Sequence, residues 1–476
     1  MVIRLFHRHI VLACILILAA VIAVTMAVNY NRVQTVPVSA ETISDFGTER
    51  QNGNREESRS NSVRGTGLTD SSLNAVSVLV SNHVASQKAA AGTSSKVPVS
   101  SNINSQKAVA GTSPKSWEMR AVWVPYMSLN MSRENDKSEQ SFLQKFNTIV
   151  KTAKSCGMNT LVVQVRPFGD ALYPSAYFPW SHIVGGTQGV NPGYDPLKDM
   201  VSACHGAGLK IHAWVNPLRI QVSGTPSILA TGNHYYKWKS ISSKSDYVID
   251  YGNGKYYNPA YAEVRNLIAD GVREIVKNYD VDGVQFDDYF YPTQTADFDQ
   301  HAYSEYCKQA KKTGIPLNLA DWRRANINAL VSQVYREIKS VKKNVPFGIA
   351  PQGNVQNDWN MGADVESWCS AQGYVDYICP QLYYNFDNPT LPFDTAAQTW
   401  KNLIKNKNLK LYFGIAVYKA NSDADSGTWK KSSSILSSQV QYGRKISCDG
   451  FMFYSYDYLT GAQTKDEVQN VIKLLN

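Results

Sequence analysis

Eight short apolar segments that alternate with amphipathic stretches constrain the fold of this chain more than any other feature. The apolar segments are 121–127, 160–166, 209–217, 281–288, 345–351, 375–384, 409–418 and 448–458. The intervening stretches with helical periodicity lie near 141–155, 196–207, 260–278, 321–342, 394–406, 432–445 and 464–475. Strands that alternate with helices form parallel sheets. Eight such units within residues 117–476 predict an α/β fold, a closed (β/α)₈ barrel with loop insertions. The alternative, a doubly wound sheet, is disfavoured because no Gly-rich phosphate loop follows the first strand.

The first 30 residues indicate export. Arg4 and Arg8 precede the apolar segment 10–28, which would form about 29 Å of helix, close to the hydrocarbon thickness of a bilayer. This length favours an uncleaved signal anchor over a cleaved signal peptide. We therefore expect a single-pass protein of the cell membrane with its main domain outside; secretion to the cell wall is the alternative.

Residues 31–116 are rich in Ser, Asn and Thr and contain a short repeat. "SQKAAAGTSSK" at 86–96 recurs as "SQKAVAGTSPK" at 105–115. A segment of this composition cannot bury enough apolar surface to fold, so it is predicted to be a flexible linker. The net charge of +9 is modest for 476 residues and no basic cluster suggests nucleic-acid binding.

Polar residues gather at the carboxyl ends of the predicted strands, where barrels of this type place their chemistry. The segment "VDGVQFDD" ends on two adjacent acids, Asp287 and Asp288. Because alternate residues of a strand face the same side, one parity carries the polar set on three strands. That set is Gln164, Arg166, His212, Trp214, Asn216, Gln285 and Asp287. Asp287 is thus predicted to point into a polar site. A buried ion pair between Asp287 and Arg166 is the structural alternative.

Glycoside hydrolysis needs a second carboxyl group, which protonates the leaving oxygen while the first attacks or activates water. The loop 352–373 offers Asp358, Asp364 and Glu366, and Asp457 ends the eighth strand. Spacing alone does not choose among these acids. His212 has no His-x-His partner and the cysteines show no metal-ligand spacing, so no metal site and no cofactor are predicted.

Five motifs resemble the glycosyl-hydrolase-like family 10 domain. They are "CHGAGLKIHAWVNPLR" (204–219), "YYNPAYAEVRNLI" (256–268), "VDGVQFDDYFYP" (281–292), "DWRRANINALV" (321–331) and "GYVDYICPQLYY" (373–384). The resemblance covers about 117–460. It implies an exported bacterial (β/α)₈ glycoside hydrolase, with a peptidoglycan glycan as the substrate of some members.

The resemblance also implies site residues. It places the acid pair on Asp287 and Asp288, and an acid followed by Trp on Asp364 and Trp368, which favours Asp364 over Glu366 as the partner acid. With the strand ends, it gives a predicted substrate-binding set. That set is Arg166, Trp214, Asn216, Gln285, Tyr289, Trp322, Arg323, Gln381 and Tyr383.

The sequence therefore predicts a glycoside hydrolase of amino-sugar cell-wall polysaccharide that works by two-carboxylate chemistry. Asp287 would be the nucleophile or the stabilising carboxylate, and Asp288 or Asp364 the general acid. Two alternatives stay open. One is a non-catalytic cell-wall glycan-binding module on the same barrel; the other is a metal-dependent deacetylase, for which no His/Asp ligand set is found.

Overall fold

A computed structural model describes residues 117–476. The predicted signal anchor and linker, residues 1–30 and 31–116, lie outside this range. No helix within residues 117–476 is both long and apolar enough to cross a membrane.

Eight parallel strands form a closed barrel, as the alternating pattern predicted. The strands are β1 (Met119–Val124), β2 (Thr160–Arg166), β3 (Lys210–Val215), β7 (Gly283–Phe286), β8 (Phe347–Ile349), β9 (Tyr377–Ile378), β10 (Lys410–Ala416) and β11 (Gly450–Tyr454). Their order around the barrel is β1-β11-β10-β9-β8-β7-β3-β2. The first strand pairs with the last, with Met119 beside Gly450, and this pairing closes the barrel.

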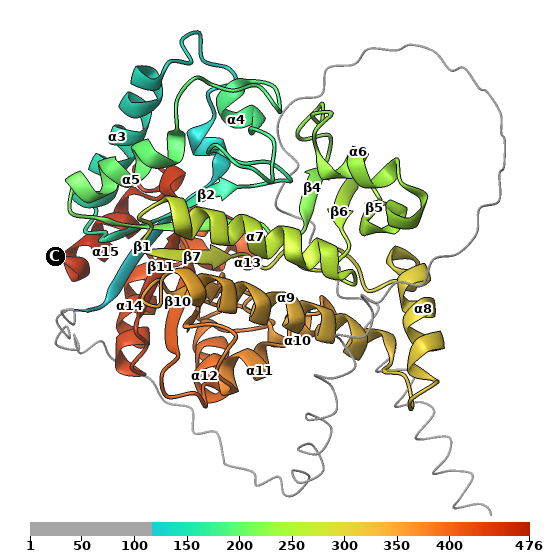
Figure 1. The fold of residues 1–476 in the computed structure, drawn as a ribbon. Coiled ribbons are helices and arrows are strands. Elements are labelled where there is room, and N and C mark those ends of the chain that lie inside the picture. The colour runs from blue at the N-terminus through green and yellow to red at the C-terminus, as the bar shows by residue number, and fades with distance from the viewer. Residues whose placement is uncertain (1–116) are drawn as a thin grey trace, which may run out of the picture. The chain divides into compact units, whose positions relative to one another are not determined.

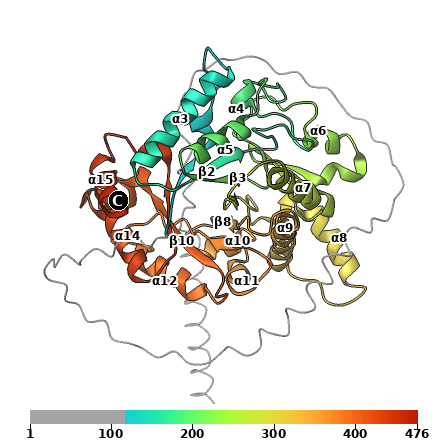
Figure 2. The same cartoon turned by 60° about the vertical axis from the view of Figure 1, so that its left-hand side comes forward.

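Helices cover the outside of the barrel (Figures 1 and 2). The main ones are α3 (Glu139–Ser155), α5 (Pro196–Gly206), α7 (Ala262–Asn278), α9 (Leu319–Val341), α12 (Phe393–Leu403), α14 (Ile435–Lys445) and α15 (Lys465–Leu475). Each matches a stretch whose apolar periodicity predicted a helix. Helices α7 and α9 pack side by side in both views.

Local sequence explains where several helices begin. The Ser138 hydroxyl accepts the Ser141 N–H at the start of α3, and the Asp195 carboxylate accepts the Lys198 N–H at the start of α5. The Asn318 side chain does the same for the Asp321 N–H at the start of α9. These side chains satisfy N–H groups that have no partner within the helix.

Two insertions were not predicted. A small antiparallel sheet follows β3, made of β4 (Arg219–Val222), β5 (Val248–Tyr251) and β6 (Gly254–Tyr257) in the order β4-β6-β5. Helix α8 (Gln300–Ala310) follows β7. Both insertions leave the barrel at the carboxyl ends of strands, and they lie on the same side of it, at the right in Figure 1.

Candidate active site

The inside of the barrel carries the polar set that strand parity predicted. Gln285 is fully buried and its Oε1 accepts the Trp123 indole N–H at 2.7 Å. The His212 Nδ1 lies 3.1 Å from the Tyr377 hydroxyl, and burial lowers the pKa of His212 to about 4. Both side chains are sealed in the barrel. The predicted role of Gln285 in substrate binding is therefore wrong; Gln285 fills the layer beneath the site.

Asp287 lies at the end of β7 and its carboxylate accepts several N–H groups. The Trp214 Nε1 donates to Oδ2 at 2.9 Å, and the Asn216 Nδ2 lies 3.2 and 3.1 Å from the two oxygens. The backbone N–H of Tyr289 donates to Oδ1 at 3.3 Å. Trp214 and Asn216 thus hold the carboxylate of Asp287 in place. Because the buried Trp214 donates its indole N–H to Asp287, it orients this acid, and the sugar-stacking role predicted for Trp214 is corrected.

The pKa of Asp287 is raised to about 7. Burial is the largest cause, because removal from water disfavours the charged carboxylate. The positive charge of Arg219 opposes this shift, and the negative charge of Asp288 adds to it. Asp287 therefore exchanges its proton near neutral pH, which suits acid/base chemistry.

Asp288 is half-buried beside Asp287, and two amides hold it. The Gln381 Nε2 donates to its Oδ1 at 2.8 Å and to the Ala350 carbonyl at 3.0 Å. The pKa of Asp288 is raised by burial, while the hydrogen bonds from Gln381 and Gln352 oppose the rise. Gln381 is thus at the site, as predicted, where it orients an acid.

Arg219 is the cation of the site, and sequence reasoning missed it. Its guanidinium lies 4.8 Å from the Phe168 ring centroid and 5.1 Å from that of Tyr289. Its Nε donates to the Pro167 carbonyl at 3.0 Å, and its backbone N–H donates to the Asn216 Oδ1 at 2.9 Å. Its place as the last residue of the motif 204–219 was the available signal.

Tyrosines line the end of the barrel around these acids. Tyr383 lies 5.9 Å, ring centroid to ring centroid, from both Tyr418 and Tyr454, and Tyr418 lies 5.9 Å from the exposed Tyr458. Tyr289 is half exposed. Tyr289 and Tyr383 therefore lie at this end of the barrel, and the half-exposed ring of Tyr289 is open to pack on a sugar face.

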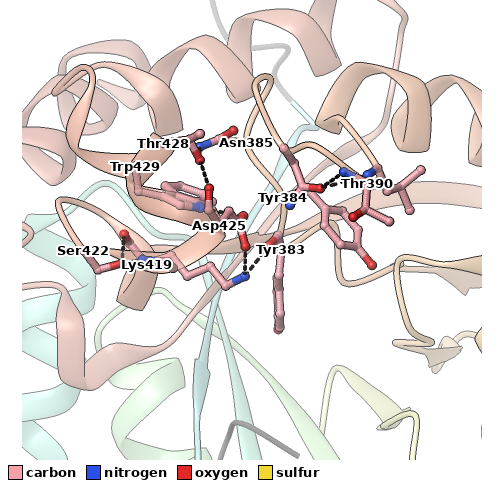
Figure 3. Close-up of polar contacts among 12 residues, drawn as sticks. Tyr383, Tyr384, Asn385, Thr390, Lys419, Ser422, Asp425, Thr428 and Trp429 are labelled. Carbon is pink, nitrogen blue, oxygen red and sulfur yellow. Dashed lines mark hydrogen bonds and ion pairs between the residues drawn. The ribbon is translucent and has the colours of Figure 1, made fainter. Parts of the chain in front are cut away.

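A polar network fixes the loop after β10 against Tyr383 (Figure 3). The Lys419 Nζ donates to the Tyr383 carbonyl at 2.9 Å and to the Asp425 carboxylate at 3.1 Å. The Asp425 carboxylate also accepts the Trp429 indole N–H at 2.8 Å. The backbone that carries Tyr383 is thus held from the neighbouring strand's loop.

A third acid, Asp358, approaches the pair from α10 (Val355–Asn360). Its Oδ1 accepts the Gln352 N–H at 2.9 Å, while its buried Oδ2 has no partner among the described residues. Its pKa is raised well above the usual value by burial, and the Asp288 charge contributes. Asp358 was considered from sequence and passed over in favour of Asp364.

Asp364 does not reach the site, so its predicted role as partner acid is corrected. Its Oδ1 accepts the Ser367 N–H at 3.2 Å at the start of α11 (Val365–Ser370), and its Oδ2 accepts the Asn328 Nδ2 at 2.7 Å. Asn328 belongs to α9, outside the barrel. Asp364 is a helix cap that ties two outer helices together.

Arg166 does not reach the site either. The pairing of β2 with β3 shifts register between Gln164 and Arg166, so alternation fails there. The Arg166 guanidinium lies 4.3 Å from the Phe178 ring centroid, and a Cβ at Gly271 of α7 would lie 2.6 Å from its Nη1. The prediction that Arg166 binds substrate or pairs with Asp287 is therefore wrong.

Trp322 and Arg323 also have other contacts. Trp322 is buried, with its ring centroid 5.2 Å from that of Tyr303. Arg323 donates to both Asp299 oxygens, at 3.0 and 2.6 Å, and to the carbonyls of Thr293 and Thr295. These residues anchor the loop after β7; the substrate contacts predicted for them are corrected. Within residues 117–476, no group of three or more His, Cys, Asp or Glu side chains could hold a metal ion.

Residues 118–430 match the family described as Glycosyl hydrolase-like 10. This chain belongs to that family. Glycosyl hydrolase YngK of Bacillus subtilis (strain 168) is 37% identical over 328 residues, which cover 65% of this chain and 62% of YngK. This chain thus spans less than two thirds of the length of YngK.

A second relative is also similar in sequence, and one solved structure shares the fold. Glycosyl hydrolase DigH of Escherichia coli (strain K12) is 32% identical over 375 residues, which cover 73% of this chain and 83% of DigH. The PgaB (BpsB) glycoside hydrolase domain from Bordetella bronchiseptica has a TM-score of 0.52 at 11% identity, covering 75% of this chain and 99% of that one. At this identity the likeness shows a shared fold.

Proposed function

We propose that this protein is an exported glycoside hydrolase that cleaves amino-sugar cell-wall polysaccharide. The adjacent acids Asp287 and Asp288 at the carboxyl end of β7 carry the proposal. Both pKa values are raised, and each negative charge disfavours the ionisation of the other, so the pair retains one proton into the neutral range. Family membership supports glycosidic bonds as the target. Export and the amino-sugar polymer are inferred from the N-terminal apolar segment and the motifs.

The surroundings of the two acids suggest different roles. Among the described residues, Asp287 accepts hydrogen bonds from the N–H groups of Trp214, Asn216 and Tyr289 alone, and such donors stabilise a negative carboxylate. When the proton that the pair shares is on Asp288, the ionised Asp287 would attack the anomeric carbon or stabilise the positive charge that develops there. Asp288, less deeply buried, would protonate the leaving oxygen.

The first test is turnover of a natural polymer. The full-length protein is incubated with purified peptidoglycan, intact and peptide-stripped, and the soluble products are identified by mass spectrometry. New sugar fragments are expected with the wild-type protein and with Asp280→Asn, and none with Asp287→Asn. Asp280 is a matched control, because its side chain is 83% exposed on the same segment. Unchanged turnover in Asp287→Asn would refute the assignment, and binding without release would favour the glycan-binding module.

The second test separates the two roles with an aryl glycoside whose leaving group needs no proton. Asp288→Asn should still cleave this substrate while it loses activity on the polymer. Asp287→Asn should lose both activities. If Asp288→Asn loses both equally, Asp288 is not the proton donor.

A further inference from the structure

Arg219 differs from the other buried arginines in having an open guanidinium. Arg323 is paired with Asp299, Arg444 with Glu118, and Arg265 donates to the carbonyls of Pro259 and Ala260. Arg166 also has no hydrogen-bond acceptor for Nη1 and Nη2 among the described residues, but both of these atoms are sealed from solvent. Among residues 117–476, no acceptor is present for Nη1 or Nη2 of Arg219, and neither atom is sealed from solvent. Arg219 as a whole residue is nonetheless buried, with only 8% of its surface exposed.

The position of this open guanidinium is tightly defined. The rings of Phe168 and Tyr289 lie within cation–π distance of it, and the Pro167 carbonyl holds its Nε. No carboxylate oxygen of the described chain lies within ion-pair distance of Arg219, although its charge acts on Asp287 and Asp288. The two free nitrogens are therefore placed beside the reacting acids without an anion of their own.

A nearly buried cation is costly unless an anion pairs with it. The planar guanidinium fits a carboxylate through two parallel hydrogen bonds, a geometry that a hydroxyl cannot match. The half-exposed Tyr289 ring beside it offers a face on which a sugar ring can pack. We propose that Arg219 and Tyr289 form a subsite for a sugar that carries a carboxylate, so that the enzyme selects an anionic glycan. This inference rests on the proposed function and names its substrate class.

Binding to a catalytically blocked protein tests the subsite. Full-length Asp288→Asn protein is titrated calorimetrically with a peptide-free oligosaccharide that contains N-acetylmuramic acid. A second titration uses the same oligosaccharide with its carboxyls converted to primary amides. Amidation should weaken binding about 10- to 100-fold, as expected for a charge-assisted bidentate contact.

Substitutions at Arg219 should remove this discrimination. Added to the blocked protein, Arg219→Met should bind both oligosaccharides with equal, weak affinity, and Arg219→Lys should retain only part of the preference. Arg324→Met is the matched control, because Arg324 also lies over an aromatic ring, 4.4 Å from the Trp359 centroid, but is paired with Asp321. Circular dichroism checks that each variant is folded.

Equal binding of the two oligosaccharides by the blocked protein, or a preference that persists in Arg219→Met, would overturn the subsite. Absence of measurable binding by either oligosaccharide would also overturn it. Hydrolysis by the unblocked protein is scored separately. Cleavage without a preference for the carboxylate would support the proposed hydrolase and refute the subsite. Carboxylate-dependent binding without cleavage would support the subsite and refute the proposed hydrolase.

Discussion

Opposing influences act on the proton of Asp287. Burial and the charge of Asp288 favour the neutral acid, while Arg219 and the N–H groups of Trp214 and Tyr289 favour the carboxylate. The net pKa of about 7 lies well above the usual value for aspartate, near 3.9. The unfolded chain thus loses this proton at a lower pH than the folded protein does.

This difference predicts how stability depends on pH. Between about pH 4 and pH 7 the folded state holds more protons than the unfolded state, so Asp287 makes the protein less stable as pH rises through this window. Asp287→Asn removes the effect, so the variant should gain up to about 4 kcal/mol relative to wild type between pH 4 and pH 7. Urea unfolding of both proteins at a series of pH values measures this difference in the free energy of unfolding. A constant difference between the two proteins would contradict the assigned pKa.

Asp358 offers a second prediction, because burial raises its pKa and its Oδ1 accepts the Gln352 N–H. Asp358→Asn retains an acceptor for the Gln352 N–H and should change the free energy of unfolding at pH 7 by less than about 1 kcal/mol. Asp358→Ala leaves that N–H without an acceptor and should cost about 1–3 kcal/mol. Chemical denaturation at pH 7 compares the two. Equal losses would show that stability does not depend on an acceptor for the Gln352 N–H at position 358.

At single positions, strand alternation predicted that the side chains of Asp287, Trp214 and Asn216 face the same side, and they do, because these strands are regular up to their ends. It failed at Arg166, where a register shift rotates the side chain out of the barrel. Arg219 lies beyond the end of β3, where the alternation of strand side chains no longer predicts orientation. The choice between Asp358 and Asp364 depended on how one loop folds, which residue spacing does not encode.

Among the elements, the loop after β7 depends on a buried ion pair. Arg323 and Asp299 have side chains that are 4% and 0% exposed, and Arg323 also binds two loop carbonyls. This contact joins α9 to the loop that follows the two acids.

Removal of one partner should therefore be costly. Arg323→Met leaves Asp299 buried without a cation and should cost about 3–5 kcal/mol, and Asp299→Asn in the same chain should restore part of this loss. Arg324→Met, whose partner Asp321 is 45% exposed, should cost less than about 1 kcal/mol. Urea unfolding measures the free energies of the three variants, with a double-mutant cycle for Arg323 and Asp299. Equal losses in Arg323→Met and Arg324→Met would refute the stabilising role of the buried ion pair.

All eight barrel strands and the main helices were predictable, because the alternation of apolar segments with amphipathic stretches extends over the whole domain and does not depend on any single residue. The β4-β6-β5 sheet was not, since its strands pair antiparallel within one insertion and do not alternate with helices. Helix α8 buries only Ala302, so its sequence has little apolar periodicity to detect.

At the scale of the whole barrel, closure depends on residues beyond the family match. The match ends at residue 430, whereas β11, which pairs with both β1 and β10, spans Gly450–Tyr454. Without β11 those two neighbours would expose unpaired strand edges.

Truncation after Lys430 should therefore abolish cooperative folding. The truncated protein is expected to aggregate or to show no sharp unfolding transition in calorimetry, because the open edges template association. A chain that lacks residues 1–116 but keeps residues 431–476 retains all eight strands and should unfold in one transition. A cooperative transition in the truncated protein would show that the barrel folds even when β1 and β10 have unpaired edges.

The β1–β11 pairing also sets a time order for folding. The ribosome makes β1 first and β11 last among the strands, yet the two are neighbours. Contacts between such distant parts of a chain form slowly, because a long loop must close before they stabilise anything. The nascent chain must therefore keep one side of β1 unpaired until synthesis has passed Tyr454, and only then can the barrel close.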